Sequence, residues 1–329
     1  VTRVAILDDY QNVANEMADW SAIPPDVQVR IFSDHLADED TLVQRLTVFD
    51  VVVGMRERTP FPRSLLERLP GLKLLVTTGM ANAAFDMEAA TDMGIVVSGT
   101  EGSSATTGEL TWGLIIASMR RIPREDKETR AGAWQTTIGP GLAGKTLGVV
   151  GLGRIGSQVA SFGLAFQMRV IAWSQNLTQG WATECGATLV TKEELLSQAD
   201  VVTIHLRLSQ RTRGLIGAEE LALMKPSAYL VNTSRGPIVD EGALIDALRG
   251  GTIAGAALDV FDVEPLPLDH PLRSMDNTVI TPHLGYVTTD SYRNMYGQVV
   301  EDIRAYLGGQ PMRVINPQVL ERPNLRRLG

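Results

Sequence analysis

A glycine-rich run near the middle of the chain constrains the fold most. The run Gly151-Leu152-Gly153-Arg154-Ile155-Gly156 is a G-x-G-x-x-G pattern between the apolar segment TLGVV and the helical segment SQVASFGLAF. In this strand–turn–helix setting the first glycine permits a tight turn, the second lets the backbone approach a pyrophosphate, and the third lets helix and strand pack closely. The N–H groups that begin the helix then attract the phosphates. We therefore predict a dinucleotide site that includes Gly151, Gly153, Arg154, Ile155 and Gly156.

Short β-rich runs alternate with helical runs on both sides of this motif. VAIL, VQVRIF, DVVVG, LKLLVTTG and GIVVSG precede it, and TLGVVG, MRVIAW, VVTIHL, AYLVNTS, TIAGAALDVF and TVITPH follow from Lys145 onward. Such alternation predicts parallel sheets with right-handed crossovers. We expect an α/β fold with two Rossmann-like parallel-sheet domains. Residues 104–285 would form the dinucleotide-binding domain, and residues 1–103 with 286–329 would form a discontinuous, flavodoxin-like substrate domain.

The composition limits the partners of this 329-residue chain. Its net charge of −8 disfavours nucleic acid and anionic membranes, because both require a basic surface. No apolar run approaches the roughly 20 residues that span a bilayer. The single cysteine, Cys185, excludes an intrachain disulfide and a cysteine-rich zinc site, and we expect no metal. The first ten residues, VTRVAILDDY, have no signal-peptide organisation, so we expect a cytoplasmic protein.

Ionisable residues follow several strands in the second half of the chain. His205 follows VVTI, Arg235 follows AYLVNTS, Glu264 comes shortly after GAALDVF, and His283 follows TVITP. The carboxyl ends of parallel strands meet at one edge of a sheet, where ligands of open α/β folds bind. We therefore expect these side chains to converge.

Three of these residues suit hydride transfer to a 2-keto acid. The guanidinium of Arg235 can bind a carboxylate bidentately, and the imidazole of His283 can donate a proton to a carbonyl oxygen as hydride arrives. A carboxylate such as Glu264 beside an imidazole favours the imidazolium and orients the ring. Each residue also has an ordinary interpretation, as a surface arginine, a solvated loop acid or a core histidine. His205 is the alternative acid–base.

Four segments in this order carry a wider resemblance. They are GKTLGVVGLGRIG at 144–156, VNTSRGPIVD at 231–240, ALDVF with EPL at 257–266, and TPHLG at 281–285. Together they resemble the D-isomer-specific 2-hydroxyacid dehydrogenases, which include phosphoglycerate and glyoxylate/hydroxypyruvate dehydrogenases. The match extends over essentially the whole chain. It implies an NAD(P)-dependent oxidoreductase that interconverts small 2-keto and D-2-hydroxy acids.

The resemblance also implies roles for single residues. In it Arg235 binds the substrate carboxylate, His283 is the acid–base, and Glu264 is the partner of His283. Asp259 would hold the nicotinamide carboxamide, and Thr233 would lie along the nicotinamide ribose. These roles agree with the chemistry argued above for the same three catalytic candidates.

Further roles follow for the first domain and the segment after it. The loop TGMAN at 78–82 resembles the family's substrate loop, whose backbone N–H groups meet the carboxylate, so Gly79 and Met80 are candidate substrate-binding residues. Arg56 in MRERT resembles a substrate-facing arginine of the phosphoglycerate enzymes. The long helical stretch from about residue 104 to 133 resembles the family's dimerisation element and predicts a homodimer.

The chain departs from the family pattern at three positions. Ser174 stands where an acidic residue usually holds the ribose hydroxyls of NAD. Its loss removes repulsion against the 2′-phosphate of NADP, so we expect NAD or NADP to be used, with NADP at least as effective. His205 and Arg207 follow the strand that borders the adenosine pocket and are further cofactor-binding candidates, Arg207 standing where the family usually has proline. Tyr286 replaces a usually small residue and is expected to narrow the substrate pocket.

A function from another class is also compatible with these motifs. The family includes corepressors that bind NAD, so the chain could be an NAD(H)-sensing interaction module. The presence of Arg235, Glu264 and His283 together favours the enzyme. Reduction of 2-keto acids by NAD(P)H distinguishes the two.

Overall fold

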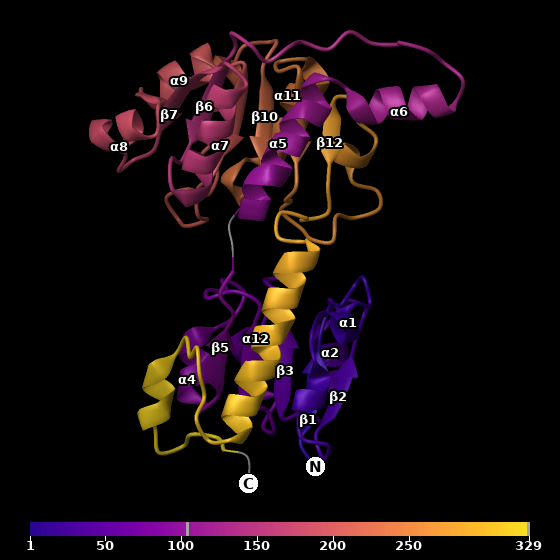
Figure 1. Ribbon diagram of the computed structural model, residues 1–329, viewed down its shortest axis with the longest axis vertical. Helices are drawn as coiled ribbons and strands as arrows, with labels where there is room; N and C mark the ends of the chain where they lie inside the picture. Colours follow the sequence, from indigo (N-terminus) through magenta and orange to yellow (C-terminus); the bar gives the residue numbers. More distant parts are fainter. Residues whose placement is uncertain (103–104, 328–329) are drawn as a thin grey trace. The chain divides into compact units, whose positions relative to one another are not determined.

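The computed structural model describes residues 1–102 and 105–327, which divide into two compact units (Figure 1). The first unit comprises Val1–Ser103 and Thr288–Gly329, and the second comprises Ser104–Val287. Each contains one parallel sheet, so the predicted α/β class with two Rossmann-like sheets is confirmed. The predicted boundary at residues 103 and 104 falls outside the described residues.

The sheet of the first unit has the strand order β2-β1-β3-β4-β5, with every pair parallel. The strands are β1 (Arg3–Ile6), β2 (Gln28–Ile31), β3 (Val51–Gly54), β4 (Leu74–Thr77) and β5 (Val96–Gly99). This is the flavodoxin-like order, in which ligands bind beyond the carboxyl ends of the strands. All residues of β3, β4 and β5 are buried, because helices cover a parallel sheet on both faces.

Three of the helices described in the first unit begin at a capping side chain. The helices of this unit are α1 (Ala14–Met17), α2 (Glu39–Leu46), α3 (Arg63–Glu67), α4 (Met87–Asp92) and α12 (Thr289–Leu307), with short 3₁₀ turns at Trp20–Ala22 and Pro317–Glu321. Asp38, Asp86 and Thr288 each accept a backbone N–H in the first turn of α2, α4 and α12. Such caps satisfy N–H groups that have no partner within the helix.

Polar contacts connect the C-terminal segment to the first sheet, which explains how two distant stretches form one unit. The Asn316 Oδ1 atom accepts from the backbone N–H of Val97 in β5 at 2.8 Å. On α12 the buried Asp302 carboxylate accepts from the Arg313 Nε atom at 3.0 Å. In Figure 1 the yellow α12 accordingly lies beside strands from the start of the chain.

The sheet of the second unit has the order β12-β11-β10-β9-β6-β7-β8, again parallel throughout. Its strands are β6 (Thr146–Val150), β7 (Arg169–Trp173), β8 (Thr188–Leu189), β9 (Val201–Ile204), β10 (Tyr229–Asn232), β11 (Gly255–Leu258) and β12 (Thr278–Ile280). The sequence pattern predicted the others but not β8, whose two residues are too few to show a periodicity. The order reverses at β6, between β7 and β9, which is where dinucleotides bind in such sheets.

Helices follow most strands of the second unit. They are α5 (Ala105–Met119), α6 (Ile122–Arg130), α7 (Arg154–Ala165), α8 (Gln179–Glu184), α9 (Lys192–Gln198), α10 (Ala218–Leu223) and α11 (Glu241–Gly250), with 3₁₀ turns at Gly236–Ile238 and Pro271–Arg273. The stretch expected as one long helix is two, α5 and α6. Arg121 adopts a left-handed conformation (φ 53°) between them, and the proline in the first turn of α6 cannot continue the preceding helix. Among the described residues, no helix has the length and apolar character needed to cross a membrane.

Candidate active site

The glycine-rich turn after β6 has the geometry that a pyrophosphate site requires. Gly151 has φ +98°, and a Cβ atom there would lie 2.7 Å from the His205 carbonyl oxygen. A Cβ on Gly156 would lie 2.0 Å from the Gly151 carbonyl oxygen, so the close approach of α7 to the turn requires glycine. A Cβ on Gly153 would meet no protein atom within 4 Å, and Gly153 caps α7 without a side-chain bond. The turn therefore fits a phosphate group at the start of α7.

A tryptophan that sequence reasoning did not identify supports this turn. The indole N–H of Trp181, on α8, donates to the Leu152 carbonyl oxygen at 2.7 Å. On the opposite side, the Gly151 N–H donates to the Trp173 carbonyl oxygen at 2.8 Å. Neither contact leaves a pattern in the sequence, because both join segments that only the folded sheet brings together.

Ser174 lies at the carboxyl end of β7, as expected, and lines a cavity of about 560 Å³. The cavity is also lined by Trp173, Gln179 and residues 189–194. Lys192 is the cation among the lining residues, and its Nζ atom lies 2.6 Å from Glu220. Arg207 is exposed on the loop after β9. The structure thus places an uncharged hydroxyl at the carboxyl end of β7.

His205 occupies the end of β9, but its environment does not suit an acid–base. Its Nε2 atom lies 2.9 Å from the Thr203 hydroxyl. Burial lowers the pKa of His205 to about 3, because desolvation penalises the charged imidazolium. Near pH 7 this environment favours the neutral ring over the imidazolium. This environment gives no support to His205 as the alternative acid–base.

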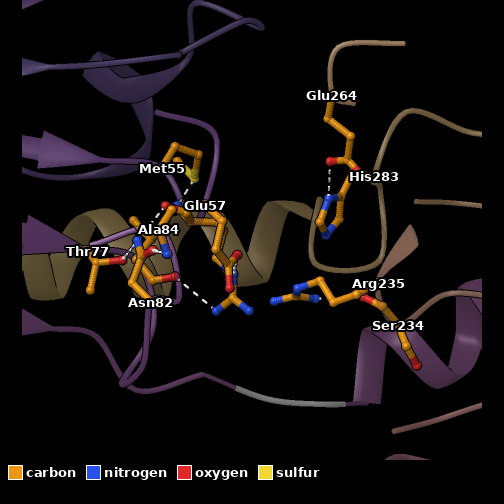
Figure 2. A network of polar contacts seen from close by, with 11 residues as sticks. Met55, Glu57, Thr77, Asn82, Ala84, Ser234, Arg235, Glu264 and His283 are labelled. Atoms are coloured by element: carbon orange, nitrogen blue, oxygen red, sulfur yellow. Dashed lines mark hydrogen bonds and ion pairs between the residues drawn. The ribbon is translucent and has the colours of Figure 1, made fainter. Parts of the chain in front are cut away.

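His283 and Glu264 form a hydrogen-bonded pair (Figure 2). The His283 Nδ1 atom lies 2.6 Å from the Glu264 Oε2 atom, and the two side chains are 19% and 32% exposed. The other carboxylate oxygen of Glu264 accepts from the Phe261 N–H at 2.9 Å, which fixes the direction of the carboxylate. Because Nδ1 faces Glu264, the Nε2 atom is the ring nitrogen that can meet a substrate.

The backbone that carries His283 is held by Asp259, which is completely buried at the end of β11. Its carboxylate accepts from the Thr281 hydroxyl at 2.6 Å, from the Leu284 N–H at 2.7 Å and from the Gly285 N–H at 2.9 Å. Desolvation raises the pKa of Asp259, and the hydrogen bond from Thr281 opposes that shift. Sequence reasoning assigned Asp259 to the nicotinamide and did not identify these contacts, which span more than twenty residues.

Arg235 stands between β10 and a 3₁₀ turn, and hydrogen bonds fix its backbone. The Asn232 side chain donates to the Arg235 carbonyl oxygen at 2.9 Å, and the Ser234 hydroxyl donates to the carbonyl oxygen of Ile204 at 2.6 Å. A Cβ on Gly236 would lie 2.1 Å from the Phe261 carbonyl carbon, so this loop packs directly on the segment that leads to Glu264. Figure 2 shows Arg235 with the His283–Glu264 pair of the same unit.

The structure also brings together the substrate-binding candidates of the first unit. The Arg56 guanidinium donates to the Thr78 carbonyl oxygen at 3.0 Å. A Cβ on Gly79 (φ +147°) would lie 2.3 Å from a guanidinium nitrogen of Arg56. The Asn82 side chain donates to the Arg56 carbonyl oxygen at 2.6 Å and to the Thr77 hydroxyl at 2.9 Å, and Figure 2 shows Asn82 beside Thr77. Met80 is 45% exposed. Arg56 and the 78–82 loop thus form one structure at the carboxyl edge of β3 and β4.

Comparison with known proteins identifies the family. Residues 112–285 match the model of the D-isomer specific 2-hydroxyacid dehydrogenase NAD-binding domain. The chain is 42% identical to a glyoxylate reductase from Aeropyrum pernix over 78% of this chain and 80% of that protein. It is 39% identical to a D-3-phosphoglycerate dehydrogenase from Methanocaldococcus jannaschii, over 87% of this chain but 54% of that longer protein. A crystal structure of a phosphoglycerate oxidoreductase from Vibrio cholerae O395 matches with a TM-score of 0.90 and 37% identity, over 94% of this chain and all of the other.

The chain therefore belongs to the D-isomer-specific 2-hydroxyacid dehydrogenase family, as its motifs predicted. Its second unit contains the family's NAD-binding domain, and a nicotinamide dinucleotide is the cofactor that this domain implies.

Two glycine substitutions separate the packing role of the turn from its binding role. Gly153→Ala should leave the free energy of unfolding within about 1 kcal/mol of wild type, since φ is negative there and no atom is displaced. It should nevertheless weaken NAD(P)H binding at least about tenfold, because a methyl group would meet the pyrophosphate. Gly156→Ala should destabilise the protein by about 1–3 kcal/mol through overpacking. Denaturant unfolding measures the free energy of unfolding, and NAD(P)H fluorescence titration measures the binding of the cofactor. Unimpaired binding in Gly153→Ala would contradict the pyrophosphate assignment.

Proposed function

We propose that this protein is an NAD(P)-dependent dehydrogenase that interconverts small 2-keto acids and D-2-hydroxy acids. His283 is the acid–base, Glu264 its partner and Arg235 the group that binds the substrate carboxylate. The observation that carries the proposal is the 2.6 Å contact between the His283 Nδ1 atom and the Glu264 carboxylate. Family membership and the relatives named as dehydrogenases and reductases of 2-keto and 2-hydroxy acids support it.

The proton transfer follows from how the His283 ring is held. Glu264 accepts a hydrogen bond from the Nδ1–H group of His283 and stabilises positive charge on the ring. The Nε2 atom therefore carries the proton that goes to the substrate carbonyl oxygen. In the oxidative direction the neutral Nε2 atom takes the hydroxyl proton. The nicotinamide, when bound, supplies or accepts the hydride.

The carboxylate of the substrate needs a donor with a fixed direction. The planar guanidinium of Arg235 can bind both carboxylate oxygens, and its fixed backbone limits the directions it can take. We also assign Gly79, Met80 and Arg56 of the first unit to substrate binding. Arg56 already donates to the Thr78 carbonyl oxygen, so it supports the 78–82 loop as well.

The cofactor would be held by the following residues of the second unit. Gly151, Gly153, Arg154, Ile155 and Gly156 would bind the pyrophosphate, Ser174, His205 and Arg207 would border the adenosine, and Thr233 and Asp259 would meet the nicotinamide half. The Thr233 hydroxyl lies 2.8 Å from that of Thr111, which fixes its position. The Asp259 carboxylate is completely buried and accepts three hydrogen bonds, two of them from the backbone that follows His283.

We further propose that two copies of the chain associate through α6 and the segment that follows it. Helix α6 has no buried residue, and Trp134 and Ile138 beyond it are 79% and 95% exposed. Large apolar side chains exposed on an extended segment are typical of an interface. Sedimentation analysis should give a native mass of two chains. A monomer at micromolar concentration would contradict the proposed dimer.

Substitution of the catalytic candidates tests the proposed activity. His283→Gln should lower turnover with glyoxylate or hydroxypyruvate by a factor of roughly 100 to 10,000, which is typical for loss of a general acid. Arg235→Lys should lower kcat/KM for the keto acid severely, since an ammonium cannot form the bidentate contact. NAD(P)H binding should survive in both variants.

The chain contains a matched control for His283. His270 also pairs with a carboxylate, at 3.0 Å from Glu241 in the same unit, so His270→Gln should keep wild-type turnover. Wild-type protein that binds NADH but reduces no keto acid would instead support the NAD(H)-sensing module. Near-normal turnover in His283→Gln would remove the acid–base assignment.

The uncharged residue at the end of β7 leads to a prediction about the cofactor. We expect wild-type protein to use NADPH at least as well as NADH, because Ser174 presents no negative charge to a 2′-phosphate. Ser174→Asp should shift the preference toward NADH by at least about tenfold, since a carboxylate repels the phosphate and accepts the ribose hydroxyls. The ratio of kcat/KM for the two cofactors measures this. A tenfold preference of the wild type for NADH would contradict it.

A further inference from the structure

Tyr286, which the sequence led us to expect at the substrate pocket, lies beside the proposed catalytic histidine. Its ring centroid is 5.6 Å from that of His283, and the two ring planes meet at 73°. This edge-to-face arrangement is one that aromatic pairs prefer. Each ring therefore restricts the other.

The backbone around Tyr286 is held at several points, so its ring has a defined position. The Gly285 N–H donates to Asp259, and the Gly285 carbonyl oxygen accepts from the hydroxyls of Thr106 and Thr107 at 2.9 and 3.0 Å. The Val287 N–H donates to the Leu284 carbonyl oxygen at 2.8 Å, which closes a tight turn with Tyr286 inside it. Movement of the ring would have to come from its own side-chain rotation.

The distance between the two rings is one at which Tyr286 could form a wall beside a substrate side chain. A carbonyl oxygen that receives a proton from the His283 Nε2 atom lies about 2.6–3.2 Å from it. The substituent on the third carbon of a 2-keto acid is only two or three bonds further away. With ordinary bond lengths added to the contact between Nε2 and the carbonyl oxygen, this substituent lies roughly 5–6 Å from the imidazole. This is the distance at which the Tyr286 ring stands.

We propose that Tyr286 is a specificity-determining residue, a fixed aromatic wall that admits 2-keto acids with short third-carbon substituents and excludes bulky ones. This inference rests on the proposed function and names its substrate class: glyoxylate, which has no third carbon, fits, as do pyruvate and hydroxypyruvate, and phenylpyruvate does not. The bulk of the ring carries the selection. The hydroxyl group is not required for it.

The test compares kcat/KM for glyoxylate and phenylpyruvate in wild type and three variants. Tyr286→Ala should raise the phenylpyruvate-to-glyoxylate ratio at least about tenfold, because even one methylene group in a hydrophobic pocket typically changes discrimination by about 10–200-fold. Tyr286→Leu should give an intermediate ratio and guards against poor folding of the alanine variant. Tyr286→Phe should stay within about threefold of wild type. Leu223→Ala, which removes an exposed apolar side chain on α10 elsewhere in the same unit, should leave the ratio unchanged.

The outcomes separate this inference from the function on which it rests. Wild-type protein that binds NADH but reduces no 2-keto acid overturns both. Active wild type with the same ratio in Tyr286→Ala and Tyr286→Leu overturns the role of Tyr286 alone. A shift in Tyr286→Phe as large as in Tyr286→Ala also overturns it, because the hydroxyl group and not the ring would then set the selection.

Discussion

The buried carboxylate of Asp259 is the contact on which the geometry of the site depends. It accepts from the Thr281 hydroxyl and from the N–H groups of Leu284 and Gly285, on either side of His283. His283 itself has a backbone φ of +55°, which is uncommon for a residue other than glycine, so its backbone needs such support. The carboxylate makes up for its own burial through these hydrogen bonds, and the turn that presents the imidazole gains a fixed position.

The remainder of the second unit brings the reacting groups to this turn. Strands β10, β11 and β12 are adjacent and parallel, so their carboxyl ends deliver Arg235, Glu264 and His283 to one edge of the sheet. The glycine-rich turn lies at the same edge, after β6, where the strand order reverses. Gly236 couples the Arg235 loop to the segment that leads to Glu264, because a side chain there would collide with Phe261. Sheet topology thus converts residues far apart in the chain into one set.

The sequence was sufficient for whatever depends on local pattern. The glycine spacing and the alternation of strands with helices predicted both sheets, and residues at strand ends predicted the His283–Glu264 pair. Contacts between distant segments were not predictable: the Asp259 network, the Trp181 bond to Leu152 and the connection of Asn316 to β5 leave no periodicity. His205 shows a related limit. Its place at a strand end was evident, but its burial, and hence its lowered pKa, arises only from packing.

One measurement tests the central claim that Asp259 positions His283 for proton transfer. In Asp259→Asn the amide nitrogen cannot accept a hydrogen bond, so at least one of the three donors loses its acceptor. Single-turnover reduction of glyoxylate by the preformed complex with NAD(P)H should slow at least about 100-fold, the scale expected when a general acid loses its alignment. Thr281→Val, which removes one donor and leaves both turn N–H bonds, should slow it much less. Wild-type rates in a folded Asp259→Asn variant would contradict the account.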